Sequence, residues 1–258
     1  MSAFERRLEI VEQLKKANKV NVEKLAKQFF VCESTIRRDL DRIVREGMAK
    51  RTYGGAVLLD NSTSDLPMLI RERENTEIKN AIARRAVEFI RDGDTIFMDT
   101  SSTVMALVPL LDKFTGLTIV TNGLKTAYLL NTYNEITTHC TGGRLRQHNM
   151  ALVGNSACRR IKEINANIAF ISCRGINMDK GVTEASEEEA EVKRAMLFSS
   201  ERTFLLCDSK KFGRVLTYHI CALTSLNTLI SDVEPPAELY NVLKEIGVDI
   251  VIASPQAK

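Results

Sequence analysis

Apolar side chains recur at every third or fourth position over residues 4–17, 22–29 and 34–45, and this spacing predicts three amphipathic helices. A four-residue break at residues 30–33 precedes the third helix, as in a helix-turn-helix. Residues 48–57 contain a Gly-Gly pair at a bend, which predicts a short β-hairpin, or wing. Periodicity alone does not distinguish this arrangement from any other small helical bundle.

Beyond residue 76, short apolar runs alternate with helical segments. The expected strands are 95–98, 117–121, 135–140, 167–172, 203–207 and 248–252, with further apolar runs at 219–223 and 226–230. The expected helices are 77–91, 103–112, 124–131, 187–199 and 236–246. This alternation predicts an α/β domain with a mostly parallel sheet and helices on both faces.

The chain is therefore expected to be α/β overall. Residues 1–57 would form an N-terminal winged helix-turn-helix domain, and residues 77–258 a Rossmann-like α/β domain. Residues 58–76 contain Asn, Ser, Thr, Asp and Pro without a convincing period, which predicts a linker.

Charge is distributed unevenly between these parts. The whole chain has 36 Lys and Arg against 33 Asp and Glu. Residues 1–57 carry 13 basic and 8 acidic residues, whereas the remaining 201 residues carry 23 and 25. A basic N-terminal part favours contact with a polyanion, although a solvated basic face would give the same count.

Composition excludes several classes of protein. A hydrophobic fraction of 44% and a charged fraction of 27% are typical of a globular chain and not of a disordered one. The apolar runs are far shorter than the ~20 residues that span a bilayer, and no apolar signal-peptide core follows the charged N-terminus. We expect a cytoplasmic protein with no membrane partner.

The six cysteines include no CxxC pair, and the three His residues show no metal-ligand spacing. Most of the cysteines lie in apolar segments, which indicates buried free thiols in a reducing compartment. The sequence predicts neither a metal site nor a cofactor.

Hydroxyl and guanidinium groups crowd the start of the third helix. Arginine can donate two hydrogen bonds to a guanine edge, and hydroxyls reach phosphates or bases. Asp39 would repel phosphate, so we expect it to orient Arg42 or Arg38. The candidate DNA contacts are Ser34, Thr35, Arg37, Arg38 and Arg42 on the helix, and Arg51 and Tyr53 on the wing.

Four expected strands of the body end in small, hydroxylated, glycine-rich or basic residues. These strand ends are residues 99–103, 121–123, 141–146 and 208–213. Because ligands of parallel sheets bind beyond the carboxyl ends of the strands, we expect these segments to meet in one site. Hydroxyls and free N–H groups at helix starts favour phosphate, so a phosphorylated small molecule is the predicted ligand.

The motif VCESTIRRDLDRIVREGMAKRTYGGAV resembles the winged helix-turn-helix of DeoR-family transcriptional regulators. The motifs DTSST, TNG, GGRLR, ALVG, GVTEASEEEAEVKRAM and DSKKFG resemble, in order, the effector domain of that family, whose fold is similar to ribose-5-phosphate isomerase. The resemblance implies a regulator, usually a repressor of a carbohydrate operon, that senses a phosphorylated sugar or sugar acid. It implies a double-stranded DNA operator and a homo-oligomer, either a dimer or a tetramer.

Carried over by position, the resemblance assigns an effector site with basic positions at Arg146, Lys193 and Lys211. Its other members are Asp99, Ser102, Thr103, Thr121, Asn122, Gly142 and Gly143. We add Ser101 and Arg174 to the candidate site, although the family usually has other residues at these two positions. No catalytic pair is identifiable. A metabolic isomerase with a helical appendage, and an activator of the same family, are the alternative functions.

Three positions depart from the family pattern. Cys32 stands where serine is usual before the recognition helix, and Ser101 replaces a glycine of the phosphate loop. Arg174 replaces an aspartate, which reverses the local charge. We hypothesise that the ligand carries extra negative charge, as a sugar-acid phosphate or a bisphosphate does. The alternative is that Arg174 pairs with a nearby carboxylate, namely Glu184, Glu187 or Glu188.

Overall fold

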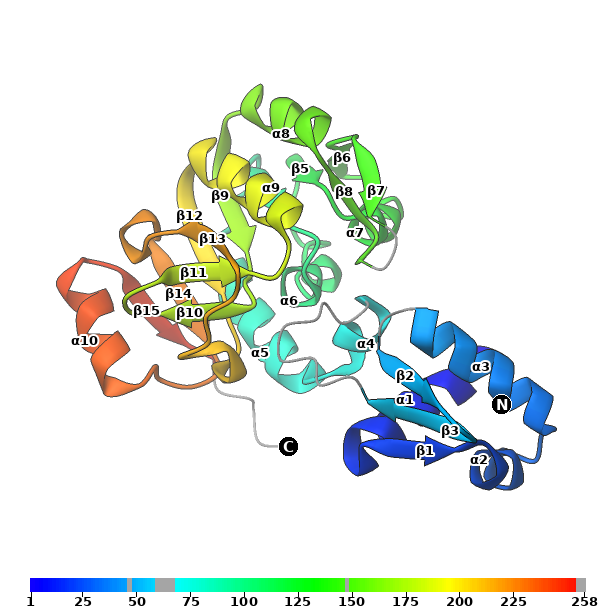
Figure 1. The fold of residues 1–258 in the computed structure, drawn as a ribbon. Helices are drawn as coiled ribbons and strands as arrows, with labels where there is room; N and C mark the ends of the chain where they lie inside the picture. The colour runs from blue at the N-terminus through cyan, green and yellow to red at the C-terminus, as the bar shows by residue number, and fades with distance from the viewer. Residues whose placement is uncertain (46–47, 59–67, 147–148, 254–258) are drawn as a thin grey trace. The chain divides into compact units, whose positions relative to one another are not determined.

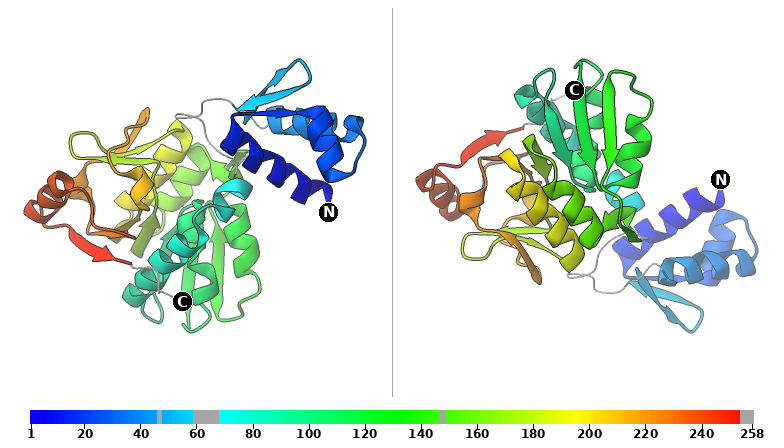
Figure 2. Two further views of the ribbon diagram at one scale, coloured as in Figure 1. Left: turned by 90° about the horizontal axis from the view of Figure 1, so that it is seen from below. Right: turned by 90° about the horizontal axis from the view of Figure 1, so that it is seen from above.

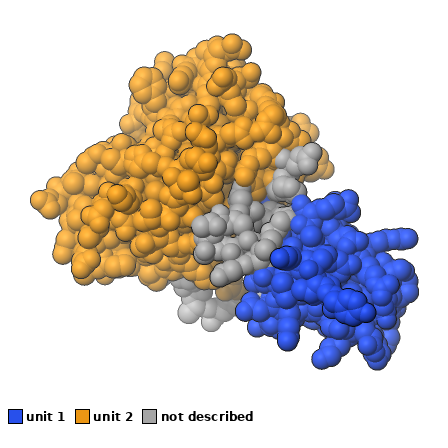
Figure 3. All heavy atoms as spheres, in the orientation of Figure 1, with its two compact units in different colours: residues 1–70 blue, residues 71–258 orange. Residues whose placement is uncertain are grey.

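The computed structural model describes residues 1–45, 48–58, 68–146 and 149–253 (Figure 1). The chain divides into two compact units, unit 1 (residues 1–70) and unit 2 (residues 71–258), which Figure 3 colours separately. In the described part of the chain, no helix is long and apolar enough to cross a membrane.

The described residues of unit 1 form three helices, α1 (Ala3–Ala17), α2 (Val22–Phe29) and α3 (Glu33–Arg45), close to the predicted ranges. The wing consists of β2 (Ala49–Thr52) and β3 (Gly55–Leu58), and β1 (Lys19–Asn21), which the periodicity does not predict, pairs with β3. At Gly55 a Cβ would lie 1.9 Å from the Val20 carbonyl oxygen, so the close approach of β1 and β3 requires glycine.

Unit 2 contains a seven-stranded sheet of parallel strands, with the order β15-β14-β12-β9-β4-β5-β6. Its strands are β4 (Thr95–Met98), β5 (Leu117–Thr121), β6 (Ile136–Cys140), β9 (Ala166–Ile171), β12 (Ser200–Leu206), β14 (Thr228–Ser231) and β15 (Asp249–Ile252). The chain runs outward from β4 to β6 and then returns to the other side of β4. The strand order therefore reverses between β4 and β9, the position at which such sheets bind ligands.

Alternating side chains of the strands supply two separate apolar cores. In β4, Ile96 and Met98 pack into one core and Phe97 into the other. The first core is covered by α5 (Thr76–Ala86), α6 (Ser102–Met105) and α7 (Leu124–Leu130), and the second by α8 (Asn155–Lys162), α9 (Glu187–Phe198) and α10 (Ala237–Glu245). The two helical layers are visible in Figure 2. The expected α/β architecture is confirmed.

Smaller elements beside this sheet were not predicted. The strands β10 (Gly175–Asn177), β11 (Gly181–Glu184) and β13 (Tyr218–Cys221) form a second sheet. The strands β7 (Arg144–Arg146) and β8 (Ala151–Val153) form an antiparallel pair. Strands of three or four residues are too short to establish a period.

Two predicted helices are shorter than expected. The expected helix 77–91 is α5, which ends at Ala86 and passes into a 3-10 turn at Val87–Phe89. The expected helix 103–112 is only the four-residue α6, followed by a 3-10 turn at Val108–Leu110. Pro109 lies in that second turn and lacks the N–H that a continuous α-helix requires.

The segment predicted as a linker contains a short helix, α4 (Met68–Arg73), which is too brief for its period to be recognised. Leu58 belongs to β3 and Thr76 to α5. Residues 59–67 of the predicted linker lie outside the described residues. The boundary between the two units falls after Ile70, within α4.

Candidate nucleic-acid interface and candidate effector site

The helix α3 places its polar and apolar side chains on opposite faces. Ile36, Leu40 and Ile43 are buried in the core of unit 1. Ser34, Arg37, Arg38 and Arg42 are exposed and Thr35 is half-buried. Five of the predicted DNA-contacting residues therefore lie on one helix and are open to a ligand.

Neighbouring arginines on this face differ in their partners. Arg37 donates to the Glu33 carboxylate one turn earlier, at 2.7 Å. Arg38 has no ion-pair partner within the described residues. A base-contacting role costs Arg38 no existing ion pair, whereas Arg37 would have to leave Glu33.

Asp39 does not have the predicted role of orienting Arg42 or Arg38. It is 4% exposed and points into unit 1, where its carboxylate accepts from Arg6 Nε at 2.6 Å and Arg7 Nη1 at 3.4 Å. The reason is helical geometry, because position 39 lies three residues after the buried Ile36 and so shares its face. Asp39 thus fastens α3 to α1 and keeps its charge away from the exposed face.

The two predicted wing residues have different surroundings. Arg51 Nε contacts Asp41 Oδ1 of α3 at 2.9 Å, and Arg51 Nη1 donates to the Gly55 carbonyl at 3.2 Å. Arg51 therefore fixes the wing against the helix. Tyr53, at the turn between β2 and β3, is fully exposed.

Cys32 is exposed immediately before α3. Its Sγ lies 3.1 Å from both Ser34 Oγ and Thr35 Oγ1. Hydrogen bonding from Ser34, and then from Thr35, lowers the pKa of the Cys32 thiol to about 7. A substantial fraction of this thiol is therefore thiolate near neutral pH.

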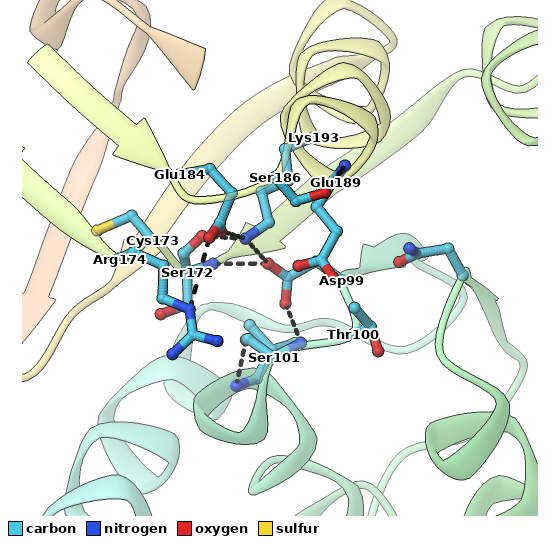
Figure 4. A network of polar contacts seen from close by, with 12 residues as sticks. Asp99, Thr100, Ser101, Ser172, Cys173, Arg174, Glu184, Ser186, Glu189 and Lys193 are labelled. Carbon is cyan, nitrogen blue, oxygen red and sulfur yellow. Dashed lines mark hydrogen bonds and ion pairs between the residues drawn. The ribbon is translucent and has the colours of Figure 1, made fainter. Parts of the chain in front are cut away.

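In unit 2, Asp99 bridges the strand ends at the point where the sheet order reverses (Figure 4). It is fully buried after β4, and its Oδ1 accepts from the Ser101 backbone N–H at 2.8 Å. Its Oδ2 accepts from the Ser172 N–H, which follows β9, at 2.9 Å. Ser101 in turn caps α6, because its Oγ accepts from the Val104 N–H at 3.2 Å.

Lys193 of α9 is the buried cation of this network. Its Nζ lies 2.5 Å from Glu184 Oε2 and 3.3 Å from Asp99 Oδ2, and it donates to the Ser172 carbonyl at 2.9 Å. Burial opposes protonation of Lys193, but the two carboxylates outweigh it and raise its pKa above the usual value. Burial likewise opposes ionisation of Glu184, yet Lys193 and Arg174 hold the pKa of this carboxyl below its usual range. Lys193 and Glu184 are therefore both ionised at neutral pH.

Two further cations lie at the more open edge of the same network. Lys211 Nζ donates to Ser172 Oγ at 3.2 Å and lies 3.3 Å from Asp208 Oδ2. Arg174 Nε lies 3.5 Å from Glu184 Oε1, which is the pairing that we considered as the alternative role of Arg174. The side chains of Arg174 and Lys211 are 19% and 16% exposed, against 1–2% for Asp99 and Glu184. The two cations are thus more exposed than the carboxylates of Asp99 and Glu184.

The remaining predicted residues of the effector site mostly support loops at the ends of β5 and β6. Thr121 Oγ1 accepts from the Gly123 N–H at 3.0 Å, and the Asn122 side chain donates to the Leu152 carbonyl at 3.2 Å. Gly143 has φ +106°, and a Cβ there would lie 2.6 Å from the Val153 carbonyl oxygen. Gly142 also has a positive φ, and Ser102 and Thr103 are buried in α6.

Glu189 of α9 brings these loops toward the buried network. Its Oε1 accepts from Arg146 Nη1 at 2.6 Å and from Asn149 Nδ2 at 2.8 Å. Thr100, beside Asp99, donates to the Asn149 carbonyl at 3.3 Å. The predicted residues thus lie along one edge of the sheet, and Glu189 and Asn149, which the sequence did not indicate, connect several of them by hydrogen bonds.

Lys79 of α5 was also missed. It is 6% exposed, and burial, followed by the charge of Lys211, lowers its pKa to about 8. The sequence does indicate that Lys79 is buried. Position 79 lies three residues before Ile82 and four before Ala83, so it shares the buried face of α5 with them. In the described part of the chain, no group of three or more His, Cys, Asp or Glu side chains could hold a metal ion.

A winged helix-turn-helix followed by a doubly wound sheet with a polar site defines a DNA-binding protein with a ligand-sensing domain. Two family models match the chain, the DeoR-like helix-turn-helix domain over residues 6–62 and the DeoR C terminal sensor domain over residues 74–233. The chain belongs to the DeoR family of transcriptional regulators, which confirms the resemblance found in its motifs. Members of this family are regulators and not enzymes, so the isomerase alternative is wrong.

Relatives match the chain over nearly its whole length. The HTH-type transcriptional regulator GolR of Listeria innocua is 34% identical, covering 98% of this chain and 100% of the relative. The glycerol-3-phosphate regulon repressor of Escherichia coli K12 is 30% identical, covering 97% and 99%. Among solved structures, ribose 5-phosphate isomerase A of Methanocaldococcus jannaschii is similar with a TM-score of 0.40 and 16% identity, covering 54% of this chain and 55% of that chain.

Proposed function

We propose that this protein is a cytoplasmic repressor of a carbohydrate-utilisation operon that releases its operator when a phosphorylated sugar or sugar acid binds unit 2. The observation that carries the ligand class is the layering of charge at the reversal of the sheet, with carboxylates beneath and Arg174 and Lys211 at the open edge. Anionic groups of a small ligand are stabilised by such cations. Relatives that include the HTH-type transcriptional repressor GlcR of Bacillus subtilis, which is 30% identical, support the repressor role.

The operator contacts proposed for unit 1 are Ser34, Thr35, Arg37, Arg38 and Arg42 on α3, with Arg51 and Tyr53 on the wing. A symmetric operator with half-sites about 34 Å apart, or a multiple of this, needs paired recognition helices. We therefore propose a dimer or tetramer. Light scattering of the free protein and of its operator complex tests this assembly, and a monomer on DNA would contradict it.

The primary experiment is fluorescence-anisotropy binding of the full chain to DNA from upstream of its own gene. We expect tight, salt-sensitive binding, because phosphate contacts release counterions. One member of a panel of phosphorylated sugars and sugar acids should then release the DNA. In a reporter strain, deletion of the gene should raise operon expression. Lower expression would favour the activator alternative.

The variant Lys211→Ala tests the ligand site directly. The change removes the ammonium beside Ser172 and Asp208, so operator binding without ligand should stay near that of wild type while release by the effector is lost. The exposed Lys162 on α8 provides the matched control, and Lys162→Ala should respond normally. A full response of Lys211→Ala would remove this residue from the proposed site.

Arg174 decides between classes of effector. Because the guanidinium adds positive charge at the open edge, we propose a ligand with a second anionic group, such as a sugar-acid phosphate or a bisphosphate. Calorimetric titration should show that Arg174→Ala loses affinity for doubly anionic compounds more than for monophosphates. Equal affinities in wild type and variant would leave Arg174 only as the partner of Glu184.

A further inference from the structure

A buried ammonium group donates hydrogen bonds to backbone carbonyls at the C-terminal end of the short helix α4. Lys79 Nζ, from the following helix α5, donates to the carbonyl of Arg71 and, at 2.7 Å, to the carbonyl of Glu74. The final carbonyls of a helix have no partner inside it and must be satisfied from outside. Lys79 supplies such donors at the end of α4.

The hydroxyl of Thr76 is a hydrogen-bond donor for the neighbouring carbonyls. It lies 3.3 Å from the carbonyl oxygens of both Glu72 and Arg73. Two side chains of α5 thus face four successive carbonyls, those of residues 71 to 74, and the single hydroxyl proton of Thr76 is shared between Glu72 and Arg73. The stability of this end of α4 therefore depends on Thr76 and Lys79 together.

The two donors differ in what else they meet. Thr76 is exposed, whereas Lys79 is buried within electrostatic reach of Lys211 and Asp208 in the proposed effector site. The loop that carries these two residues also contacts the turn between α4 and α5, because Lys210 Nζ donates to Asn75 Oδ1 at 3.0 Å. Lys125 of α7, which follows the loop at the end of β5, also pairs with Glu72 of α4. Of the two donors at the end of α4, Lys79 is the one that lies within electrostatic reach of Lys211 and Asp208.

We propose that Lys79 is a positioning residue through which effector binding loosens α4. An anion bound at Lys211 competes with the Arg71 and Glu74 carbonyls for the Lys79 ammonium, so the end of α4 loses two of its donors. The boundary between the two units lies within α4, and a change in this helix therefore reaches unit 1 through the covalent chain. A ligand can shift a conformational equilibrium only through such a difference in contacts between two states. The inference rests on the proposed function, whose effector it requires.

Amide hydrogen exchange of the full chain tests the coupling, followed in peptides that cover residues 68–79. Inorganic phosphate at millimolar concentration serves as the probe, followed by the sugar-phosphate panel. In wild type, an anion that protects the loop of residues 208–213 should speed exchange in α4 about tenfold, the effect of losing one or two hydrogen bonds. Lys79→Met should exchange fast in α4 without any anion and show no further change when one is added.

Thr76→Val is the matched control, because it removes donors from the same end of α4 without touching the effector loop. It should exchange faster than wild type but keep the response to anion, and its operator should still be released by the effector with the wild-type fold-change. Lys79→Met should lose that fold-change. Methionine preserves the length and burial of the side chain, and thermal unfolding checks that the variant is folded.

Each outcome separates the coupling from the proposed function. If α4 of Lys79→Met exchanges no faster than wild type, or if this variant responds to anion as Thr76→Val does, the coupling is wrong. Protection of loop 208–213 in wild type with no change in α4 also overturns it. If no anion protects that loop, the sensor proposal fails instead. Faster exchange of α4 in Lys79→Met would still show that Lys79 stabilises this helix.

Discussion

Two ion pairs of nearly equal length, one on the exposed face of α3 in unit 1 and one in the buried network of unit 2, differ in their access to water. Arg37 and Glu33 on α3 are 2.7 Å apart with side chains 58% and 46% exposed. Lys193 and Glu184 in unit 2 are 2.5 Å apart and 4% and 2% exposed. Water screens the first pair, and the low polarity of the interior strengthens the second. The contribution of these two ion pairs to stability therefore depends on their burial and not on their length.

The difference suits the two kinds of anion proposed as ligands. A DNA backbone is a repeating polyanion, so unit 1 needs cations at its surface that exchange water and counterions for phosphate. A small effector needs a few charges held in place before it arrives, and buried ion pairs provide that preorganisation. Unit 1 can lose one surface pair cheaply, whereas unit 2 cannot lose one member of its network.

The largest expected effect follows from removing the central cation of unit 2. Lys193→Met leaves Asp99 and Glu184 buried without their shared ammonium, and should lower the free energy of unfolding by about 3–5 kcal/mol. The counterpart Arg37→Met in unit 1 should cost less than about 1 kcal/mol. Urea denaturation of both variants measures the contrast, and equal losses would contradict the ranking by burial.

Lowering the pH should erase the contribution of Glu184. Its pKa in the folded protein lies below the ordinary value of 4.5, so its stabilising effect is present above pH 4.5 and is lost as the pH falls through the folded-state pKa. Glu184→Gln should therefore be less stable than wild type by up to about 3 kcal/mol at pH 7. The two unfolding free energies should converge in acid, and a constant gap would show that ionisation is irrelevant.

Within unit 1, Arg38, for which the described residues provide no ion-pair partner, allows a finer test. Arg38→Ala should weaken operator binding by about 1–3 kcal/mol if the guanidinium contacts a base. Anisotropy with the operator and with scrambled DNA distinguishes the roles. A loss on the operator alone indicates base contact, and an equal loss on both DNAs would make Arg38 a phosphate contact.

Cys32 offers the smallest change in binding energy but a clear chemical signal. With a pKa of about 7, its thiol should react with iodoacetamide along a titration curve centred near that pH. The raised pKa values of the thiols of Cys158 and Cys221 predict that these react more slowly. Cys32→Ser should remove the fast phase seen by mass spectrometry. A fast phase that survives would assign the reactivity elsewhere.

Much of the architecture could be predicted because it repeats along the chain. Strands β4 and β5 have the predicted bounds, and α3 begins one residue before its predicted start. The short β1, α4, β7 and β10 carry too few residues for a period, and tertiary contacts decide their existence. Pro109 was a visible reason for a helix to end and was overlooked.

Side-chain partners were harder to predict than strand ends. That Asp99 and Lys211 follow strands of the sheet could be predicted, because strand ends follow from the strand pattern. The sequence did not reveal that Asp39 faces Arg6, since that pairing joins two helices far apart in sequence. The position of Lys79 on the buried face of α5 could be predicted from its spacing to Ile82 and Ala83, but its carbonyl partners at Arg71 and Glu74 could not.

The ion pair between Asp99 and Lys193 also has a consequence for the folding of the chain during its synthesis. About 90 residues separate the fully buried carboxylate from its ammonium, and ribosomes add roughly 5–20 residues per second, so Asp99 emerges about 5–20 seconds before Lys193. Until α9 is made, packing β4 into the sheet would bury the Asp99 carboxylate without a compensating positive charge. We therefore expect the Asp99 carboxylate to remain hydrated during this interval.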